Sequence, residues 1–162
     1  MLFRSRVTIE GEDIYKLSVK EQSRLRNRKM GYVFQSYFLL PELTALENVM
    51  VPGMIGSREV EERAVELLEA VGLGDRVHHL PAEFSGGEQQ RVAIARSLVN
   101  DPAIVFADEP TGNLDSKNGD EVMGLLLDFA ENLKMTLVVV THDRELAKCG
   151  DRMLMIKDGV IM

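Results

Sequence analysis

The alternation of short apolar runs with longer amphipathic stretches is the feature that most restricts the fold of this chain. Apolar runs occur at Ala103–Ala107 and Thr136–Thr141, and neither alternates with polar residues. Such runs are typical of strands in the interior of a parallel sheet, which helices cover on both faces. Helical patterns lie between the runs, so the sequence predicts an α/β fold.

Further strands are predicted nearer to the two ends of the chain. They cover Val7–Glu10, Gly31–Phe34 and Arg152–Ile156, the last followed by an Asp158-Gly159 turn. A helix over Ser18–Arg28 is indicated by its first residues, because Ser18 and Glu21 match a capping box. Gln35 then stands directly after a predicted strand.

Between residues 36 and 99 the strand signals disappear and helical patterns follow one another. Thr44 and Glu47 match a second capping box. In the stretch Ser57–Gly72, apolar residues fall on one helical face, and Gly72 is placed to end the helix. These residues are Val60, Ala64, Leu67, Leu68 and Val71. We therefore predict a single domain over residues 1–162, with a helical subdomain at 36–99 and a sheet-forming part at 100–162.

The composition fits one globular unit that does not bind nucleic acid. Of the 162 residues, 45% are hydrophobic, which is enough for a packed core. The net charge of -7 repels the phosphate backbone of nucleic acids. No apolar run approaches the roughly 20 residues that span a bilayer, and Met1–Arg6 has no signal-peptide core. A single cysteine, Cys149, excludes an internal disulfide and suits a reducing compartment.

Two carboxylates follow the apolar run at Ile104–Ala107. Asp108 and Glu109 stand at the carboxyl end of this predicted strand, where open α/β sheets bind their ligands. Such a pair can hold Mg²⁺ through Asp108 and orient or deprotonate an attacking water through Glu109. A strand that ends in a solvated acidic turn explains the pair equally well.

The string Ser85-Gly86-Gly87-Glu88-Gln89 is more informative. Ser85 and Glu88 match a capping box, yet two glycines in the first turn weaken a helix by about 1 kcal/mol each relative to alanine. Glycine lets backbone N–H groups approach an anion closely, and a helix N-terminus favours a phosphate. The string therefore predicts a helix start that binds phosphate.

His142 follows the run at Thr136–Thr141 and is predicted to lie at the same edge of the sheet. A lone histidine at such a place is more often structural than functional. However, Gln35, the Asp108-Glu109 pair and Asp115 are also placed at strand ends or in the loops after them. Four such groups at one edge favour a shared active site.

On these motifs, the chain from about Val7 to its end resembles an ABC-type ATPase. The matching segments are Gln35 (Q-loop), Phe84–Arg91 (signature motif), Ile104–Glu109 (Walker B strand), Gly112–Asp115 (D-loop) and His142 (switch histidine). Phe84 and Glu88 depart from the commonest signature, L-S-G-G-Q. The strings T-A-L-E-N-V, R-V-A-I-A-R-S-L-V-N-D-P and A-D-E-P-T-G-N-L-D are similar to those of ATPases in lipoprotein-release and macrolide-export systems.

The resemblance implies ATP and Mg²⁺ as cofactors and a role for each motif residue. The implied catalytic residues are Glu109, His142 and Gln35, and Asp108 and Gln35 are implied to contact Mg²⁺ bound with ATP. The residues implied to contact the nucleotide are Ser85, Gly86, Gly87, Glu88 and Asp115. The implied partners are a second ATPase subunit and membrane-embedded transporter subunits, at the cytoplasmic face of the membrane, where ATP hydrolysis drives transport.

The phosphate-binding loop of this family, G-x-x-x-x-G-K-[ST], has no match, because none of the 13 glycines precedes a lysine. In the family the loop lies before the strand that corresponds to Val7–Glu10, and an aromatic residue that stacks on adenine also lies upstream. We therefore expect the chain to begin after the loop and to be impaired alone. A non-catalytic partner-binding fragment of such an ATPase stays open as an alternative. A DNA-repair-type ABC ATPase fits less well, since no sustained heptads separate Gln35 from Ser85.

Overall fold

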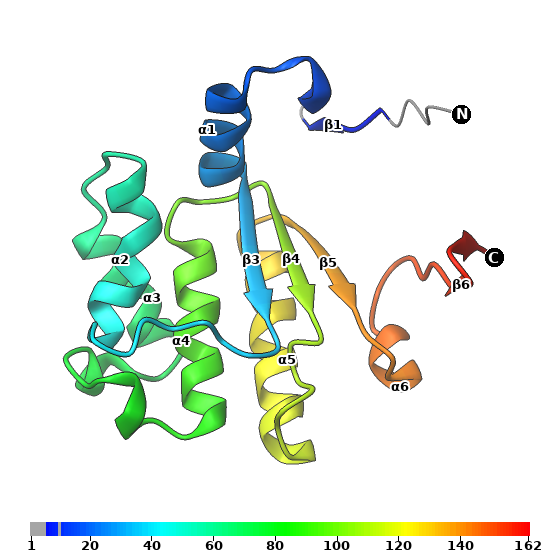
Figure 1. Cartoon of the computed structure of the whole chain (residues 1–162). Coiled ribbons are helices and arrows are strands. Elements are labelled where there is room, and N and C mark those ends of the chain that lie inside the picture. The colour runs from blue at the N-terminus through cyan, green and yellow to red at the C-terminus, as the bar shows by residue number, and fades with distance from the viewer. Residues whose placement is uncertain (1–5, 10) are drawn as a thin grey trace.

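The computed structural model describes residues 6–9 and 11–162 and confirms the α/β class. Its centre is a parallel sheet with the strand order β3-β4-β5, formed by Met30–Phe34, Ile104–Asp108 and Thr136–Val140. The register pairs Tyr32 with Phe106, and Phe106 with Val138. Figure 1 shows the three strands running in one direction, so their carboxyl ends meet at one edge.

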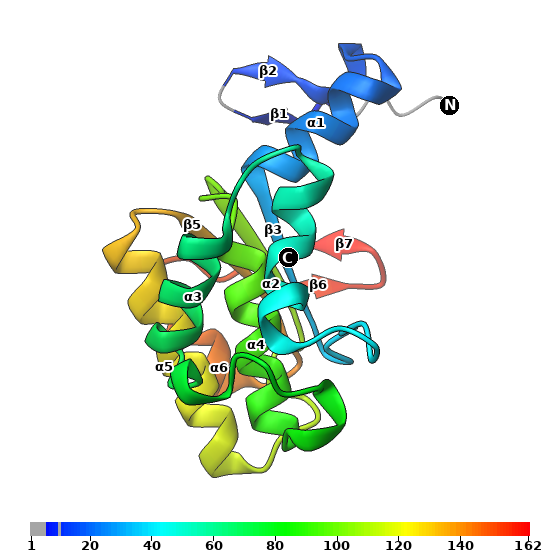
Figure 2. The same ribbon diagram turned by 90° about the vertical axis from the view of Figure 1, so that its left-hand side faces the viewer.

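Six α-helices accompany the sheet in the described part of the chain. They are α1 (Val19–Lys29), α2 (Ala45–Ile55), α3 (Glu61–Ala70), α4 (Gly86–Leu98), α5 (Ser116–Asn132) and α6 (Arg144–Ala147). Three short 3₁₀ helices are η1 (Ile14–Lys16), η2 (Gly74–Arg76) and η3 (Pro81–Glu83). Figures 1 and 2 show α2, α3 and α4 gathered together, with α5 next to α4. None of the helices within residues 6–9 and 11–162 is long and apolar enough to cross a membrane.

Three helices begin at capping boxes. Ser18 and Glu21 start α1, and Thr44 and Glu47 start α2, as the sequence predicts. Ser85 starts α4 in the same way, with Glu88 as its partner. In each box the hydroxyl oxygen accepts a hydrogen bond from the glutamate N–H, and the glutamate carboxylate accepts one from the cap residue N–H. The entry points of these helices are therefore set by local sequence.

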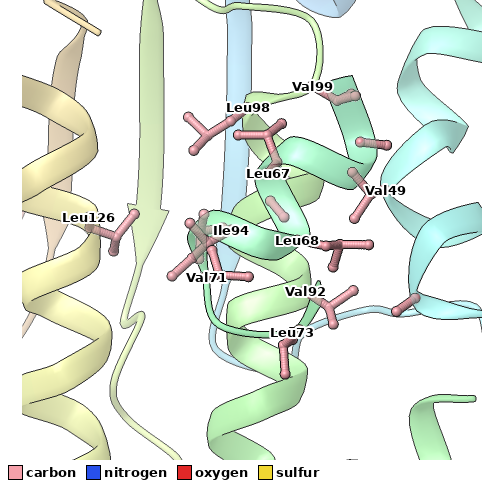
Figure 3. Packing of buried hydrophobic residues seen from close by; sticks show 14 of the residues in the cluster. Val49, Leu67, Leu68, Val71, Leu73, Val92, Ile94, Leu98, Val99 and Leu126 are labelled. Atoms are coloured by element: carbon pink, nitrogen blue, oxygen red, sulfur yellow. The ribbon is translucent and has the colours of Figure 1, made fainter. Parts of the chain in front are cut away.

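The predicted apolar face of α3 lies in the core. Its residues are at most 5% exposed: Val60, Ala64, Leu67, Leu68 and Val71. Figure 3 shows Leu67 and Val71 close to Leu98 and Ile94 of α4. Within the stretch Ser57–Gly72 the helix begins at Glu61, without a side-chain cap. Gly72 follows its end with a φ of +77°, as expected of a helix-ending glycine.

The two faces of the sheet differ in burial. On one face, Val33, Val105 and Ala107 are at most 1% exposed, and they pack in the core with α4 and α5. The expectation that Thr136–Thr141 is buried on both faces is wrong. β5 is an edge strand with α5 against one face, and the side chains on its other face are exposed. Val140 is accordingly 58% exposed.

Two short hairpins lie near the ends of the chain and form no ladder with the main sheet. β1 (Thr8–Ile9) pairs antiparallel with β2 (Glu12–Asp13), so a strand is present within the predicted Val7–Glu10, of which Glu10 lies outside the described residues. β6 (Ile156–Lys157) pairs with β7 (Val160–Ile161) around the predicted Asp158-Gly159 turn. The predicted strand at Arg152–Ile156 is wrong except for its last residue. Its side chains are all exposed, so the apolar run has no sheet to join.

Candidate functional site

The carboxyl edge of the sheet gathers the residues that the sequence places at strand ends. Gln35 follows β3, Asp108 ends β4 with Glu109 directly after it, and His142 lies two residues beyond β5. The parallel register pairs Phe34 with Asp108, and Asp108 with Val140, so these ends are neighbours. Their meeting at one edge follows from topology, as predicted.

Glu109 and His142 form the tightest contact at this edge. Glu109 Oε1 accepts a hydrogen bond of 2.8 Å from the His142 backbone N–H and lies 2.7 Å from His142 Nδ1. Glu109 Oε2 accepts a bond of 3.2 Å from Thr141 Oγ1. The glutamate side chain is 22% exposed and the histidine side chain 86% exposed. The loop after β5 therefore binds both carboxylate oxygens of Glu109, while the imidazole of His142 faces solvent.

This pairing changes both pKa values. Burial by itself raises the pKa of Glu109, but the hydrogen bonds from His142 and Thr141, together with the histidine charge, bring that pKa below its usual value. The hydrogen bond to Glu109, followed by its negative charge, raises the pKa of His142. An ionised Glu109 favours a proton on Nδ1 of the ring, which leaves Nε2 for a further partner.

The backbone of Glu109 is strained. Its φ of +46° lies in the left-handed region, which costs a side-chain-bearing residue on the order of 1–3 kcal/mol and is found most often at functional sites. Two backbone hydrogen bonds hold it there, from Glu109 N to Val140 O at 2.9 Å and from Gly112 N to Glu109 O at 3.0 Å. The chain therefore turns sharply after β4 and directs this carboxylate towards the loop after β5.

Asp108 and Gln35 provide oxygen atoms of the kind that Mg²⁺ prefers. The Asp108 carboxylate is exposed and makes no hydrogen bond or ion pair within residues 6–9 and 11–162. No cluster of three or more histidine, cysteine or acidic side chains in that part of the chain could hold a metal ion. The donor set therefore fits Mg²⁺ that takes its remaining ligands from a bound nucleotide.

Gln35 is fixed to the loop after β4 through Asn113. Gln35 Nε2 donates to Asn113 Oδ1 at 3.0 Å, and Asn113 Nδ2 donates to Gln35 O at 2.9 Å. Gly112 makes room for this pair, because a Cβ there would lie 2.8 Å from Gln35 Nε2. The motif at Gly112–Asp115 is visible in the sequence, but this reciprocal bond is not.

The two glycines at the start of α4 have close neighbours. A Cβ at Gly86 would lie 2.8 Å from the Tyr37 hydroxyl, and one at Gly87 would lie 3.0 Å from Asn118 Oδ1. This close packing is a structural reason for glycine at both positions, in addition to the approach of a phosphate that the sequence predicts. Ser85 Oγ donates to Glu88 Oε2 at 2.8 Å, so Ser85 and the first N–H groups of α4 stand together at the helix start.

Asp115 caps α5. Its carboxylate accepts hydrogen bonds from the side chain and the backbone N–H of Asn118, which lower the pKa of Asp115 in that order of importance. The main contacts of the Asp115 carboxylate are therefore those of an N-cap at the start of α5. In the described structure its hydrogen bonds go to Asn118, which also packs against Gly87 of α4.

Helix α4 connects the two loops of the site. Arg96 donates to the backbone oxygens of Tyr37 at 2.6 Å and Phe38 at 2.5 Å, two consecutive residues with left-handed φ angles of 58° and 48°. The buried Gln90 donates from Nε2 to Pro110 O at 2.6 Å, next to Glu109. Neither contact could be read from spacing, because both run from one helix to strand-end loops far away in sequence.

Comparisons with known proteins found similar sequences and structures. A family model described as "ABC transporter" matches residues 4–112. The lipoprotein-releasing system ATP-binding protein LolD of Shewanella frigidimarina is 49% identical over 158 residues, which are 96% of this chain and 66% of LolD. An uncharacterized ABC transporter ATP-binding protein of Thermotoga maritima is 53% identical over 161 residues, 98% of this chain and 68% of its own length. The chain thus spans about two thirds of the curated relatives that it matches.

The fold is also similar to solved structures. A dimeric post-hydrolysis state of the ATP-binding cassette MJ0796, bound to ADP and Pi, superposes with a TM-score of 0.84 at 42% sequence identity. A second dimeric structure of MJ0796 gives the same TM-score at 43% identity. Both alignments cover 96% of this chain and 70% of the cassette.

Proposed function

Because this chain belongs to the ABC transporter family, we propose that it comes from the ATP-binding subunit of a transporter and supplies the signature and hydrolysis half of an ATPase site. The observation that carries the proposal is the connection made by α4. Ser85 caps its N-terminus, and the same helix hydrogen-bonds the loop after Gln35 and the loop after Glu109. The phosphate-contacting group and the hydrolytic group are thereby parts of one packed unit.

On the hydrolysis side, Glu109 is the proposed base. Its lowered pKa keeps the carboxylate ionised at neutral pH, so it can accept a proton from an attacking water. His142 is proposed to donate from Nε2 to a phosphate oxygen, and its raised pKa favours the protonated form that does so. Asp108 and Gln35 would hold Mg²⁺, which neutralises phosphate charge when it is bound with ATP.

On the signature side, Ser85 and the N–H groups of Gly86 and Gly87 are proposed to contact the phosphate of a nucleotide held by a second subunit. A helix start concentrates unpaired N–H groups and partial positive charge, which favours an anion. The dimeric form of the similar cassette MJ0796, in its complex with ADP and Pi, supports a paired arrangement. Glu88 and Asp115 then act near the nucleotide by fixing the starts of α4 and α5.

The 162-residue chain by itself is proposed to bind Mg-ATP weakly and to release no phosphate in steady turnover. The reason is that it contains no G-x-x-x-x-G-K-[ST] loop, whose N–H groups and lysine hold the β- and γ-phosphates in P-loop ATPases. Calorimetric titration with Mg-ATP and a phosphate-release assay test this. Micromolar affinity together with steady turnover would contradict it.

A mixing experiment tests the main proposal. The chain is combined with a partner cassette that contains the G-x-x-x-x-G-K-[ST] loop but has its own signature serine replaced by arginine. We expect hydrolysis to recover at one composite site, and we expect Ser85→Arg in the chain to abolish that recovery. Association without any recovery would instead support a non-catalytic partner-binding fragment.

The transported substrate is proposed to be a lipoprotein or a compound that is expelled from the cell. The support is the LolD name of several relatives that are 49–50% identical to this chain. The membrane-embedded partner is proposed to dock on Gln35–Leu43 at the cytoplasmic face of the membrane, where Phe38 and Leu40 are 64% and 45% exposed. Crosslinks that avoid this segment and cluster elsewhere would contradict the docking site.

A further inference from the structure

Arg76 makes three separate contacts with the segment that starts α4. Its Nη1 forms an ion pair with Glu88 Oε1, and its Nη2 donates to Glu83 O at 2.7 Å. Its guanidinium carbon lies 4.6 Å from the centre of the Phe84 ring, within the range of a cation–π contact. The Arg76 and Glu88 side chains are 32% and 31% exposed, so water screens this ion pair only partly.

The two carboxylate oxygens of Glu88 have different partners. Oε2 accepts hydrogen bonds of 2.8 Å from both the N–H and the hydroxyl of Ser85, while Oε1 faces Arg76. The bond from the Ser85 N–H is the main cause that holds the pKa of Glu88 below its usual value, against the opposing effect of burial. A full negative charge therefore stands in the first turn of α4.

That charge has an electrostatic consequence for the proposed phosphate contact. A helix start attracts a phosphate, but a carboxylate next to it repels one. The commonest signature has a neutral glutamine where this chain has Glu88, and leucine where it has Phe84. Both of the differing residues contact Arg76 in this structure. The negative charge and the aromatic ring thus share a single cationic partner.

We propose that Arg76 is a positioning residue for the signature motif, which neutralises Glu88 and keeps Glu88 on the Ser85 cap so that a phosphate can approach Ser85, Gly86 and Gly87. This inference rests on the proposed function of α4 as a contact for nucleotide held by another chain. Arg76 contacts Glu83, Phe84 and Glu88, and we assign its effect on the phosphate to its ion pair with Glu88.

The test is a double-mutant cycle in the mixing experiment, with four forms of the chain: unchanged, Arg76→Ala, Glu88→Gln, and both together. We expect Arg76→Ala to raise the apparent KM for ATP by about tenfold, because the unpaired and only partly exposed charge of Glu88 then repels the phosphate of the nucleotide. Glu88→Gln should change that KM by less than about threefold, and the double variant should behave like Glu88→Gln. The defect of Arg76→Ala should shrink as salt is added, because salt screens like charges.

A purely structural role for Arg76 gives a different pattern. The contacts with Glu83 and Phe84 are lost with or without Glu88, so the double variant would then be as defective as Arg76→Ala. Arg63→Ala is the matched control, since Arg63 lies on α3, outside the signature motif, and forms ion pairs with Glu66 at 3.2 Å and with Asp101 at 3.3 Å. We expect Arg63→Ala to leave the KM unchanged.

Arg76→Lys keeps the inference testable if the alanine variant does not fold. Lysine retains the charge but not the planar fork, so we expect a KM within about threefold of the unchanged chain. The inference would be overturned if Arg76→Lys raised the KM by as much as the loss of the contacts with Glu83 and Phe84 predicts. It would also be overturned if Glu88→Gln did not relieve the defect of Arg76→Ala. If Ser85→Arg abolishes recovery but Arg76→Ala has no effect, this inference alone fails. If the soluble unchanged chain gives no recovery, the proposed function fails and the inference fails with it.

Discussion

Helix α4 and the segment 141–162 bear the two halves of the proposed site, and the fold holds them very differently. In α4, Val92, Ile94 and Leu98 have no exposed surface at all. In the segment 141–162 no residue is buried, and Leu146 is its one apolar residue packed partly against the core. His142 depends on its bonds to Glu109 for its place. The phosphate-contacting half is thus part of the core, whereas the histidine half can move without disturbing the core.

The largest expected effect comes from shortening a core side chain on α4. Ile94→Ala leaves a cavity in a fully buried site and should lower the free energy of unfolding by about 2–5 kcal/mol. The matched change in the other region, Leu146→Ala, should cost less than about 1 kcal/mol, since Leu146 is only half-buried. Urea unfolding followed by circular dichroism measures both. Equal losses would mean that the two halves are held equally firmly.

A smaller effect is expected where α4 rests on the sheet. A Cβ at Gly31 of β3 would collide with the backbone oxygen of Ser97, so Gly31→Ala should lower the free energy of unfolding by about 1–3 kcal/mol. Gly124→Ala is the control, because a Cβ at Gly124 on α5 would meet nothing within 4 Å. That change should stabilise the chain by about 0.5–1 kcal/mol through helix propensity. If Gly31→Ala did not lower the free energy of unfolding, α4 would not be packed closely against β3.

The N-caps of the two regions allow a finer comparison. Ser85 caps the 13-residue α4, whereas Asp143 caps the four-residue α6. Ser85→Ala should cost about 1 kcal/mol of unfolding free energy. Asp143→Ala should cost only a few tenths, because so short and exposed a helix contributes little to global stability. Thermal and urea unfolding of the two variants side by side provide the measurement, and a larger loss for Asp143→Ala would reverse the comparison.

The smallest expected effect is the dependence of stability on pH through His142. Its pKa is raised in the folded chain, so the stability it contributes is fully present below its unfolded pKa of about 6.5 and is lost as the pH rises through the folded value. Glu109 has a lowered pKa, and its contribution is lost as the pH falls through that value. The pair should therefore stabilise most between the unfolded pKa values of the two groups, from about 4.5 for Glu109 to about 6.5 for His142.

An NMR titration of the His142 ring checks this dependence. We expect Glu109→Gln to lower the pKa of His142, and we expect Glu145→Gln on the same segment to change it little, since Glu145 bonds Lys148 instead. A histidine pKa unaffected by Glu109→Gln would show that the two side chains are not paired in solution.

Local signals in the sequence were enough to predict the starts of α1, α2 and α4 and the neighbouring positions of the strand ends. Ser18, Thr44 and Ser85 each begin a helix because the partner glutamate stands three residues later, which is a property of one short string. Gln35, Glu109 and His142 lie at one edge of the sheet because parallel strands end together, and Glu109 and His142 are in direct contact there. Both deductions need only local pattern and the right fold class.

The remaining contacts depend on distances between elements, which no local pattern contains. Arg76 meets Phe84 and Glu88 because a 3₁₀ helix folds back on the start of α4. The burial of β5 was predicted wrongly for a related reason: an apolar run does not show whether a strand is central or at an edge. The prediction of a strand at Arg152–Ile156 was wrong for a similar reason, since pairing partners decide where strands form.

The reciprocal bond between Gln35 and Asn113 has a consequence for loop exchange between proteins. Each residue both donates to and accepts from the other, and a side chain at Gly112 would occupy the space of the Gln35 amide. A loop from another protein that lacks either amide, or that has a side chain at position 112, would break this bond. The two loops therefore need to be exchanged together. Chimaeras that take one loop from each of two proteins should assemble poorly, even when each loop is native to the protein that it comes from.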